Sequence, residues 1–186
     1  APQAPTVLES ANQYYNSGNI AIQIAKEIRD AGYETRAHID GNYKVIAPLI
    51  ASDAGLGEIG RMGILMTPIV GPRVRIGVIT TNMPLSPTEV KPDNSTLEFC
   101  LACKKCATNC PSQAISLNPP EDINGAFRWQ INQEACFEYW TKSGTDCGKC
   151  MIVCPYSHPN NLLHNLVRKG ISSSSSFRKF ALWADD

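Results

Sequence analysis

Cys100-Leu-Ala-Cys-Lys-Lys-Cys-Ala-Thr-Asn-Cys110-Pro111 is the stretch that decides how this 186-residue chain folds. A second run, Cys136-x10-Cys147-x2-Cys150-x3-Cys154-Pro155, follows it, and the two runs use all eight cysteines of the sequence. Such combs, closed by Cys-Pro, are typical of proteins with two [4Fe-4S] clusters, in which the fourth cysteine of each run ligates the other cluster. We therefore predict one cluster on Cys100, Cys103, Cys106 and Cys154, and a second on Cys136, Cys147, Cys150 and Cys110.

Disulfides and zinc are the competing interpretations of these cysteines. Disulfide frameworks belong mostly to small secreted domains that lack a core, whereas a chain of this length with 43% apolar residues can bury one. Zinc sites favour isolated Cys-x2-Cys pairs, often with histidine, and do not require a third cysteine followed by a Cys-Pro step. Because the spacing occurs twice with both prolines in place, it favours iron–sulfur clusters.

The gap between Cys136 and Cys147 makes the second run atypical. Its first part, Cys136-Phe-Glu-Tyr-Trp140, predicts a helical turn that carries the ligand, and Gly144 is expected to end that helix. Tyr139 and Trp140 flank the ligand, and we expect them to shield the cluster from water.

The charge balance disfavours nucleic acid as a partner. The 17 Lys and Arg residues equal the 17 Asp and Glu residues, so no basic footprint for DNA, tRNA or a membrane surface is expected. The sequence has no apolar stretch of about 18 residues and no signal peptide at its start. It opens on Ala-Pro-Gln-Ala-Pro without methionine, from which we expect a processed or truncated product.

The residues before a proline-rich stretch, 83–92, predict an α/β arrangement. Isoleucines at helical spacing indicate a helix over 17–31, and a mostly apolar segment indicates a second helix over 44–54. Strands are expected over 34–39 and, from the alternation Arg-Val-Arg-Ile-Gly-Val-Ile-Thr-Thr, over 73–81.

After this stretch the cysteine combs predict a ferredoxin-like part, and the chain as a whole is predicted to be α+β. A helix is expected over 160–169, followed by a flexible polar link at the serine run 172–176 and a final segment 177–183. The predicted domains are 1–92, 93–160 and a C-terminal helix and tail, 161–186.

Gly55-Leu-Gly57-Glu-Ile-Gly60 matches the G-x-G-x-x-G pattern of dinucleotide-binding proteins, but its context does not fit. That pattern must follow a strand, and an acidic residue that binds the ribose must come about 20 residues later. Here the preceding residues look helical, and no Asp or Glu occurs between Glu58 and Glu89. The glycines still permit a bulky ligand to approach the backbone closely.

Further motifs resemble one known family, the corrinoid-dependent reductive dehalogenases, from about Tyr14 to the end of the chain. They are Gly32-Tyr33, Gly41-Asn42, Ala54-Gly-Leu-Gly-Glu-Ile-Gly-Arg-Met-Gly63, Thr67-Pro68, Gly71-Pro-Arg-Val-Arg75, Cys110-Pro-Ser112 with Ala114-Ile115, and Cys136-Phe-Glu-Tyr-Trp140 with Gly144-Thr-Asp-Cys147. The resemblance implies part of a nitroreductase-like α/β domain that binds base-off cobalamin, followed by the two-cluster domain. It implies that the clusters pass electrons to cobalamin, which removes halide from a small organohalide.

The resemblance also assigns site residues. Tyr14 is the implied proton donor, Asn42 lies near it, and the basic residue is Arg73 or Arg75, of which we favour Arg75. Tyrosine is a weak acid at pH 7, and a guanidinium beside it stabilises the phenolate. The implied cobalamin-binding residues are Gly41, Gly55, Gly57, Gly60, Arg61, Met62 and Gly63.

Several expectations concern partners and location. The resemblance implies an upstream region that supplies part of the corrinoid pocket, an external electron donor, and a place on the outer face of the cytoplasmic membrane, held there by an anchor. The alternative location is the cytoplasm. His38 does not sit in the D-x-H-x-x-G pattern of histidine-ligated corrinoid proteins, because Asp40 follows it. His158 is expected at the surface.

Two other classes stay open. The first is an electron-transfer module that carries the same clusters without a corrinoid. The second is an epoxyqueuosine-reductase-like enzyme that acts on tRNA, which the balanced charge and the lack of a helical-repeat extension disfavour.

Overall fold

The structure is a computed structural model that describes residues 4–87, 89–90 and 93–185. These residues form two compact units. The first, here called the N-terminal unit, comprises residues 4–55, 75–87 and 89–90. The second, the cysteine unit, comprises residues 56–74 and 93–185. None of the helices in the described ranges is both long and apolar enough to cross a bilayer.

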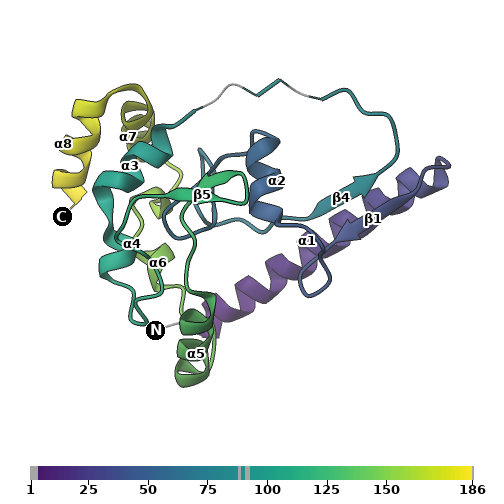
Figure 1. The fold of residues 1–186 in the computed structure, drawn as a ribbon, viewed down its shortest axis with the longest axis horizontal. Coiled ribbons are helices and arrows are strands. Elements are labelled where there is room, and N and C mark those ends of the chain that lie inside the picture. Colours follow the sequence, from purple (N-terminus) through teal and green to yellow (C-terminus); the bar gives the residue numbers. More distant parts are fainter. Residues whose placement is uncertain (1–3, 88, 91–92, 186) are drawn as a thin grey trace. The chain divides into compact units, whose positions relative to one another are not determined.

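In the N-terminal unit one long helix, α1 (Ala4–Asp30), packs against a two-stranded antiparallel sheet of β1 (Thr35–His38) and β4 (Val78–Thr81), as Figure 1 shows. The helix buries its small residues Gly18, Ala21 and Ala25, whose spacing places them on one face. A side chain at Gly77 would put Cβ 3.0 Å from the Ala21 Cβ, so small residues allow this close approach. A short helix, α2 (Ala47–Asp53), also contacts β4.

The elements of this unit differ from the prediction mainly at their ends. The helix predicted from residue 17 begins at Ala4, since Pro5 is tolerated in a first turn and no stop signal follows it. The strand over 34–39 and the helix over 44–54 are confirmed in shortened form as β1 and α2. The strand over 73–81 is confirmed only for 78–81.

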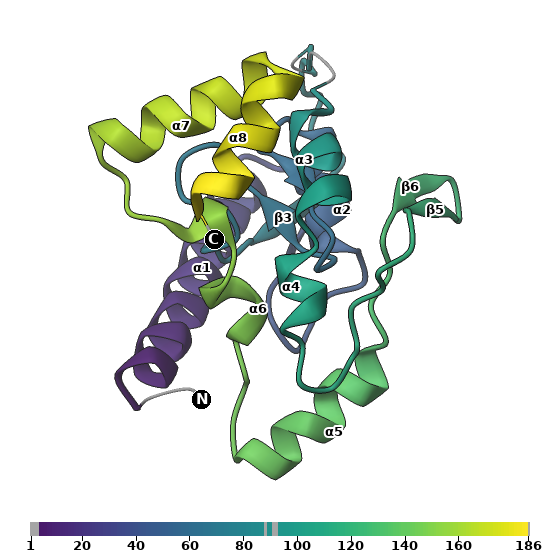
Figure 2. The ribbon, with the colours of Figure 1, turned by 90° about the vertical axis from the view of Figure 1, so that its left-hand side faces the viewer.

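The cysteine unit consists of helices and two antiparallel hairpins, β2–β3 and β5–β6. Its elements are β2 (Glu58–Ile59), β3 (Leu65–Met66), α3 (Ser95–Cys103), α4 (Lys105–Thr108), β5 (Glu121–Ile123), β6 (Ala126–Arg128), α5 (Gln133–Ser143), α6 (Lys149–Ile152), the 3-10 turn η1 (Pro155–Ser157), α7 (Leu162–Ser173) and α8 (Ser175–Asp185). Helices α7 and α8 pair with each other beside α3 (Figure 2). The mixture of helix and sheet confirms the α+β class.

The core of the cysteine unit is built around cysteines as well as ordinary apolar side chains. Phe99 is 2% exposed and meets Tyr156 edge to face, with ring centroids 5.3 Å apart. The same cluster of buried side chains contains Cys106 and Cys154. The cysteines of this unit are therefore part of its packing.

The serine run is not the flexible link that was predicted. Helix α7 continues to Ser173 and α8 begins at Ser175, so Ser174 alone interrupts the helices. The Ser173 hydroxyl donates to the Lys169 carbonyl at 2.7 Å, and the Phe177 amide lies 3.4 Å from the Ser174 hydroxyl, as in a helix N-cap. Serine is common both at helix ends and in loops. The composition of the serine run therefore does not distinguish the two structures.

Residues 56–74 belong to the same compact unit as the cysteine-bearing residues. The boundary between the two compact units therefore differs from the domain boundary predicted after residue 92. The division into domains 1–92, 93–160 and 161–186 stays a prediction about the family's domains.

Gly71 is the position where this unit depends most clearly on glycine. Its φ is +58°, and a Cβ there would lie 2.4 Å from the Tyr156 carbonyl oxygen. We expect Gly71→Ala to lower the free energy of unfolding by about 3 kcal/mol or more, from backbone strain plus overlap. Gly125→Ala, also at positive φ but with nothing within 4 Å of its Cβ, should cost about 1 kcal/mol. Equal losses in urea denaturation would contradict the close approach.

Candidate metal centre and active site

The two cysteine runs use the same local structure to present their third ligand. In the first run Lys104, with φ 57° and ψ 0°, leads into α4, which carries Cys106. In the second run Gly148, with φ 60° and ψ 3°, leads into α6, which carries Cys150. A left-handed residue before each short helix thus turns the chain inside both combs. The atypical gap of the second run is filled by α5, which carries Cys136 and ends at Gly144 as predicted.

The thiols act on one another electrostatically. The pKa of Cys154 is raised first by burial and also by Cys100, Cys103 and Cys106, although these lie in the other run. The pKa of Cys136 is raised by burial and by Cys110 and Cys147. Each of these two thiols thus has an electrostatic neighbour in the other run. No disulfide joins any of the eight cysteines, all of which lie in the described residues.

The pKa values of Cys150 and Cys110 shift in opposite directions. Burial raises the pKa of Cys150 to about 11, with added repulsion from Cys106, Cys136 and Cys110. Burial opposes ionisation of Cys110, yet its pKa is lowered because Ser112 and nearby backbone amides, such as that of Ala114 at 3.3 Å, hydrogen-bond its sulfur. Among the residues the structure describes, no three His, Cys, Asp or Glu side chains gather closely enough to hold a single metal ion.

The buried thiols make the stability of the iron-free protein depend on pH. Burial raises the pKa of Cys100 to about 11 and that of Cys106 to about 12, from an ordinary value near 9. Because the folded protein then holds these protons more tightly than the unfolded chain, their contribution is complete below about pH 9 and is lost as the pH rises through 11 to 12. We expect the free energy of unfolding of the iron-free protein, measured in urea, to fall between pH 8 and pH 11, and to fall less in Cys106→Ala. A pH-independent value would contradict this.

Arg61 lies inside the cysteine unit, 1% exposed. Its Nε donates to the Cys100 carbonyl at 3.0 Å, and its Nη1 donates to the Ser116 and Asn118 carbonyls at 2.7 and 2.9 Å. The guanidinium carbon lies 4.6 Å from the centroid of the Trp129 ring. This placement differs from the prediction that Arg61 contacts a corrinoid, because its own unit encloses the guanidinium. Met62, 4% exposed, belongs to the same unit's core.

The predicted glycines fall into two groups. At Gly57 and Gly60 a Cβ would lie 2.2 Å from the Met66 oxygen and 2.7 Å from a Met66 side-chain carbon, so packing alone requires glycine there. Gly55 follows a helix, α2, and not the strand that a dinucleotide-binding pattern needs. A Cβ at Gly55 would lie 3.0 Å from the Val90 side chain, and one at Gly63 would lie 3.4 Å from the Ile131 side chain. At Gly41, with φ +75°, nothing lies within 4 Å.

Tyr14 and Arg75 lie together in the N-terminal unit. The Arg75 guanidinium carbon is 4.3 Å from the centroid of the Tyr14 ring. One helical turn before Tyr14, the Ser10 hydroxyl accepts a hydrogen bond from Arg75 Nη2 at 2.5 Å. Tyr14 is 42% exposed, which leaves its phenol accessible. Ser10 was not predicted, although its spacing of four residues from Tyr14 on a helix is the signal that could have found it.

Arg73 does not share this position. Its Nη2 donates to the His158 carbonyl at 3.1 Å within the cysteine unit. Residues 73–77 of the strand predicted over 73–81 are not a strand, so Arg73 and Arg75 do not lie on one strand face.

The other predicted polar residues have local partners. The Asn42 side-chain oxygen accepts from Arg36 Nη2 at 2.8 Å. His38, 4% exposed, bridges the hairpin: its Nε2 is 3.0 Å from the Thr80 hydroxyl, and its Nδ1 accepts from the Lys44 amide at 3.2 Å. His38 is thus a structural histidine.

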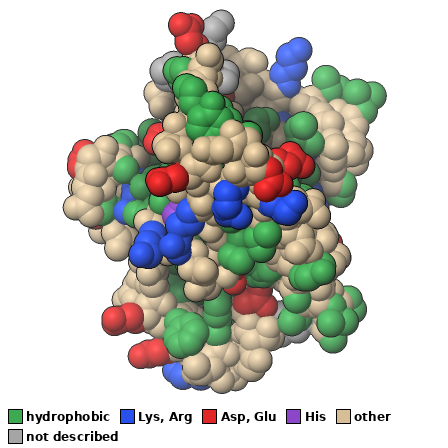
Figure 3. Space-filling view, turned by 90° about the vertical axis from the view of Figure 1, so that its right-hand side faces the viewer, with side chains coloured by type: hydrophobic (Ala, Val, Ile, Leu, Met, Phe, Trp, Pro, Cys, Tyr) green, Lys and Arg blue, Asp and Glu red, His purple; other side chains and the backbone are tan. Residues whose placement is uncertain are grey.

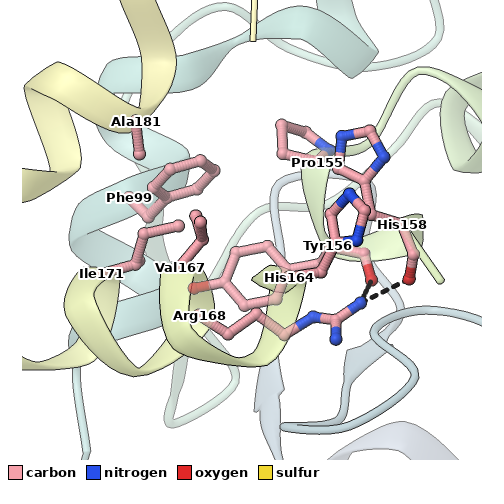
Figure 4. Close-up of a pocket in the computed structure, with 9 residues that line it drawn as sticks. All are labelled: Phe99, Pro155, Tyr156, His158, His164, Val167, Arg168, Ile171 and Ala181. Carbon is pink, nitrogen blue, oxygen red and sulfur yellow. Dashed lines mark hydrogen bonds between the residues drawn. The ribbon is translucent and has the colours of Figure 1, made fainter. Parts of the chain in front are cut away.

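One small pocket, of about 30 Å³, lies in the cysteine unit between α7, α8 and the segment after Cys154 (Figure 4). His158 and His164, which line the pocket, stack with ring centroids 4.8 Å apart, and the Arg168 guanidinium donates to the Tyr156 and His158 carbonyls. His158 is exposed, as expected. The pocket is far smaller than the cavities of about 300–1,000 Å³ that hold organic ligands, so it is not a corrinoid site.

A family model described as a 4Fe-4S dicluster domain matches residues 99–158, which include all eight cysteines, so this part of the chain is of the iron–sulfur class. The chain is 35% identical over its whole length to a tetrachloroethene reductive dehalogenase of Sulfurospirillum multivorans, of which it covers 38%. A solved reductive dehalogenase structure, described as suggesting a mechanism for B12-dependent dehalogenation, superimposes with a TM-score of 0.90 at 30% identity, over 97% of this chain and 26% of that one. The chain belongs to the reductive dehalogenase family.

The chain spans about a third of the length of such relatives. An epoxyqueuosine reductase of Listeria monocytogenes is 25% identical over only 58% of the chain, which makes that class the more distant one. Figure 3 shows side chains of both charge signs among hydrophobic ones at the surface, in keeping with the formal net charge of zero.

Proposed function

We propose that this chain is part of a reductive dehalogenase in which two [4Fe-4S] clusters and a base-off cobalamin remove halide from a small organohalide. The reaction consumes an electron pair from an external donor and one proton, and it yields free halide and a product in which hydrogen replaces that halogen. The observation that carries the proposal is the family membership together with the Tyr14–Arg75 pair. Family membership supports an organohalide as the substrate without identifying it.

The donor sets fit iron–sulfur clusters. We assign Cys100, Cys103, Cys106 and Cys154 to one cluster and Cys136, Cys147, Cys150 and Cys110 to the other. The electrostatic neighbours of Cys154 and Cys136 support this crossing, because each includes a cysteine of the other run. A Cβ at Gly60 would lie 3.7 Å from the Cys100 sulfur, so this glycine lies next to that ligand. When assembled, such clusters supply electrons at low potential.

Cobalamin would supply a strongly reducing cobalt centre at which the carbon–halogen bond breaks. The solved relative described as B12-dependent supports its presence. Of the predicted cobalamin-binding residues, Gly41 is the one whose positive φ leaves open space next to the backbone. We keep Gly41, Gly55, Gly57, Gly60 and Gly63 as candidates for close backbone approach. Arg61 and Met62 are set aside because the cysteine unit buries them.

Tyr14 is the proposed proton donor. Its side chain is 42% exposed, and the permanently charged Arg75 guanidinium lies over its ring. Ser10 fixes the guanidinium from the preceding turn of α1. Asn42, which Arg36 holds, is proposed as a polar contact near the substrate on the family resemblance alone.

We further infer, from the family resemblance, that the enzyme works at the outer face of the cytoplasmic membrane through an anchor or a further portion of chain.

The test uses the full-length natural chain that carries these residues, purified without oxygen and supplied with iron, sulfide and cobalamin. With reduced methyl viologen as donor, we expect halide release from a chlorinated or brominated substrate, and none when cobalamin is omitted. Halide release that does not require cobalamin would overturn the proposal. Bound iron without any halide release from a panel of organohalides would favour an electron-transfer module.

A further inference from the structure

Arg61 is a buried cation whose hydrogen-bond acceptors in the described part of the chain are all neutral. They are the carbonyls of Cys100, Ser116 and Asn118, and the guanidinium also faces the ring of Trp129. With 1% of its surface exposed, Arg61 is among the most buried large side chains of the molecule. Burying a charge without a counter-charge is costly, so the position of this guanidinium requires an explanation.

The charges that act on Arg61 are those of cluster ligands. Burial lowers the pKa of Arg61, and negative charge on Cys106, Cys100 and Cys103 would act against that shift. Three of the four ligands assigned to one cluster therefore interact electrostatically with the guanidinium, which also hydrogen-bonds the backbone of one of them, Cys100, at 3.0 Å. A [4Fe-4S] cluster with four thiolates carries net negative charge, and that charge grows when the cluster accepts an electron.

We propose that Arg61 is the counter-charge of the cluster on Cys100, Cys103, Cys106 and Cys154, and that it raises the reduction potential of this cluster. A fixed cation stabilises the more negative, reduced state more than the oxidised state. Because the guanidinium is buried, solvent and salt screen it weakly. The inference rests on the ligand set under Proposed function, but it does not depend on cobalamin or on dehalogenation.

Arg61 also donates hydrogen bonds to three backbone carbonyls. The test must therefore separate the effect of its charge from the effect of these hydrogen bonds. Arg61→Lys keeps the charge and loses the planar fork, whereas Arg61→Gln loses the charge and keeps a donor amide. Lys104→Gln is the matched control, because it removes an exposed charge next to the ligand Cys103. Exposed charges are well screened, so this control is expected to change little.

The experiment is a redox titration of the full-length natural chain, monitored by electron paramagnetic resonance, after iron analysis. Two four-iron clusters correspond to eight irons per chain, and wild-type protein without them would refute the ligand assignment before Arg61 is tested. In Arg61→Gln we expect the ratio of reduced to oxidised cluster to fall about tenfold at fixed potential, equivalent to a midpoint about 59 mV lower. One cluster should shift while the other does not, and Arg61→Lys and Lys104→Gln should match the wild type.

The remaining outcomes also decide the matter. No shift in an iron-replete Arg61→Gln protein, or the same shift in Arg61→Lys, would overturn the proposal. If Arg61→Gln loses half the iron while Arg61→Lys keeps all of it at the wild-type potential, the charge is what the cluster requires, and the proposal stands. Loss of iron in both variants would make Arg61 a structural clamp only.

Discussion

Replacing Tyr14 by phenylalanine is expected to lower halide release by about 100- to 10,000-fold, the range that a positioned proton donor contributes. The substitution removes only the phenolic oxygen, so the ring beneath the Arg75 guanidinium is kept. Iron content and cobalamin binding should therefore stay at the wild-type level. The measurement is the initial rate of halide release with reduced methyl viologen.

Tyr15 provides the matched control for this prediction. It follows Tyr14 on α1 but is 69% exposed, against 42% for Tyr14. Tyr15→Phe should therefore leave the rate of halide release unchanged. Equal rates in Tyr14→Phe and wild type would remove Tyr14 from the site, and equal losses in both variants would show that the effect comes from α1 as a whole.

Replacing Cys154 by serine is expected to halve the iron content, from about eight to about four irons per chain, and to abolish halide release. The physical reason is that each cluster needs four thiolates, and Cys154 is proposed to complete the set of the first run. Its electrostatic neighbours are Cys100, Cys103 and Cys106. The cluster that remains should therefore be the one held by the second run and Cys110.

Two further variants identify which cluster is lost. Cys103→Ser lies in the first set and Cys147→Ser in the second. The paramagnetic resonance spectrum of reduced Cys154→Ser should match that of Cys103→Ser and differ from that of Cys147→Ser. If it matches Cys147→Ser instead, the runs do not cross and the ligand assignment is wrong.

Local patterns predicted local features well. The sequence around Cys136 predicted the helix that carries this cysteine, and Gly144 predicted the end of that helix, α5. Both features depend on residues close together in sequence. The strand and helix over 34–39 and 44–54 were likewise found, with ends that differ by a few residues.

Long-range packing accounts for what the sequence did not predict. Arg61 resembled a ligand contact beside a glycine turn, but its partners Cys100 and Ser116 lie 39 and 55 residues away. The spacing of apolar residues along the sequence does not predict hydrogen bonds between residues so far apart. The alternation at 73–77 resembled a strand, yet Arg75 turns to the Tyr14 ring and Arg73 to the His158 carbonyl. The Ser10 hydroxyl joins the site only because α1 begins well before the residues whose periodicity revealed it.

The most direct test of the account is whether the full-length natural chain, loaded with its clusters, binds a corrinoid. Cobalamin should be retained after gel filtration without oxygen, at about one per chain, with the absorption spectrum of the base-off form. Protein that carries eight irons but retains no corrinoid would contradict the account.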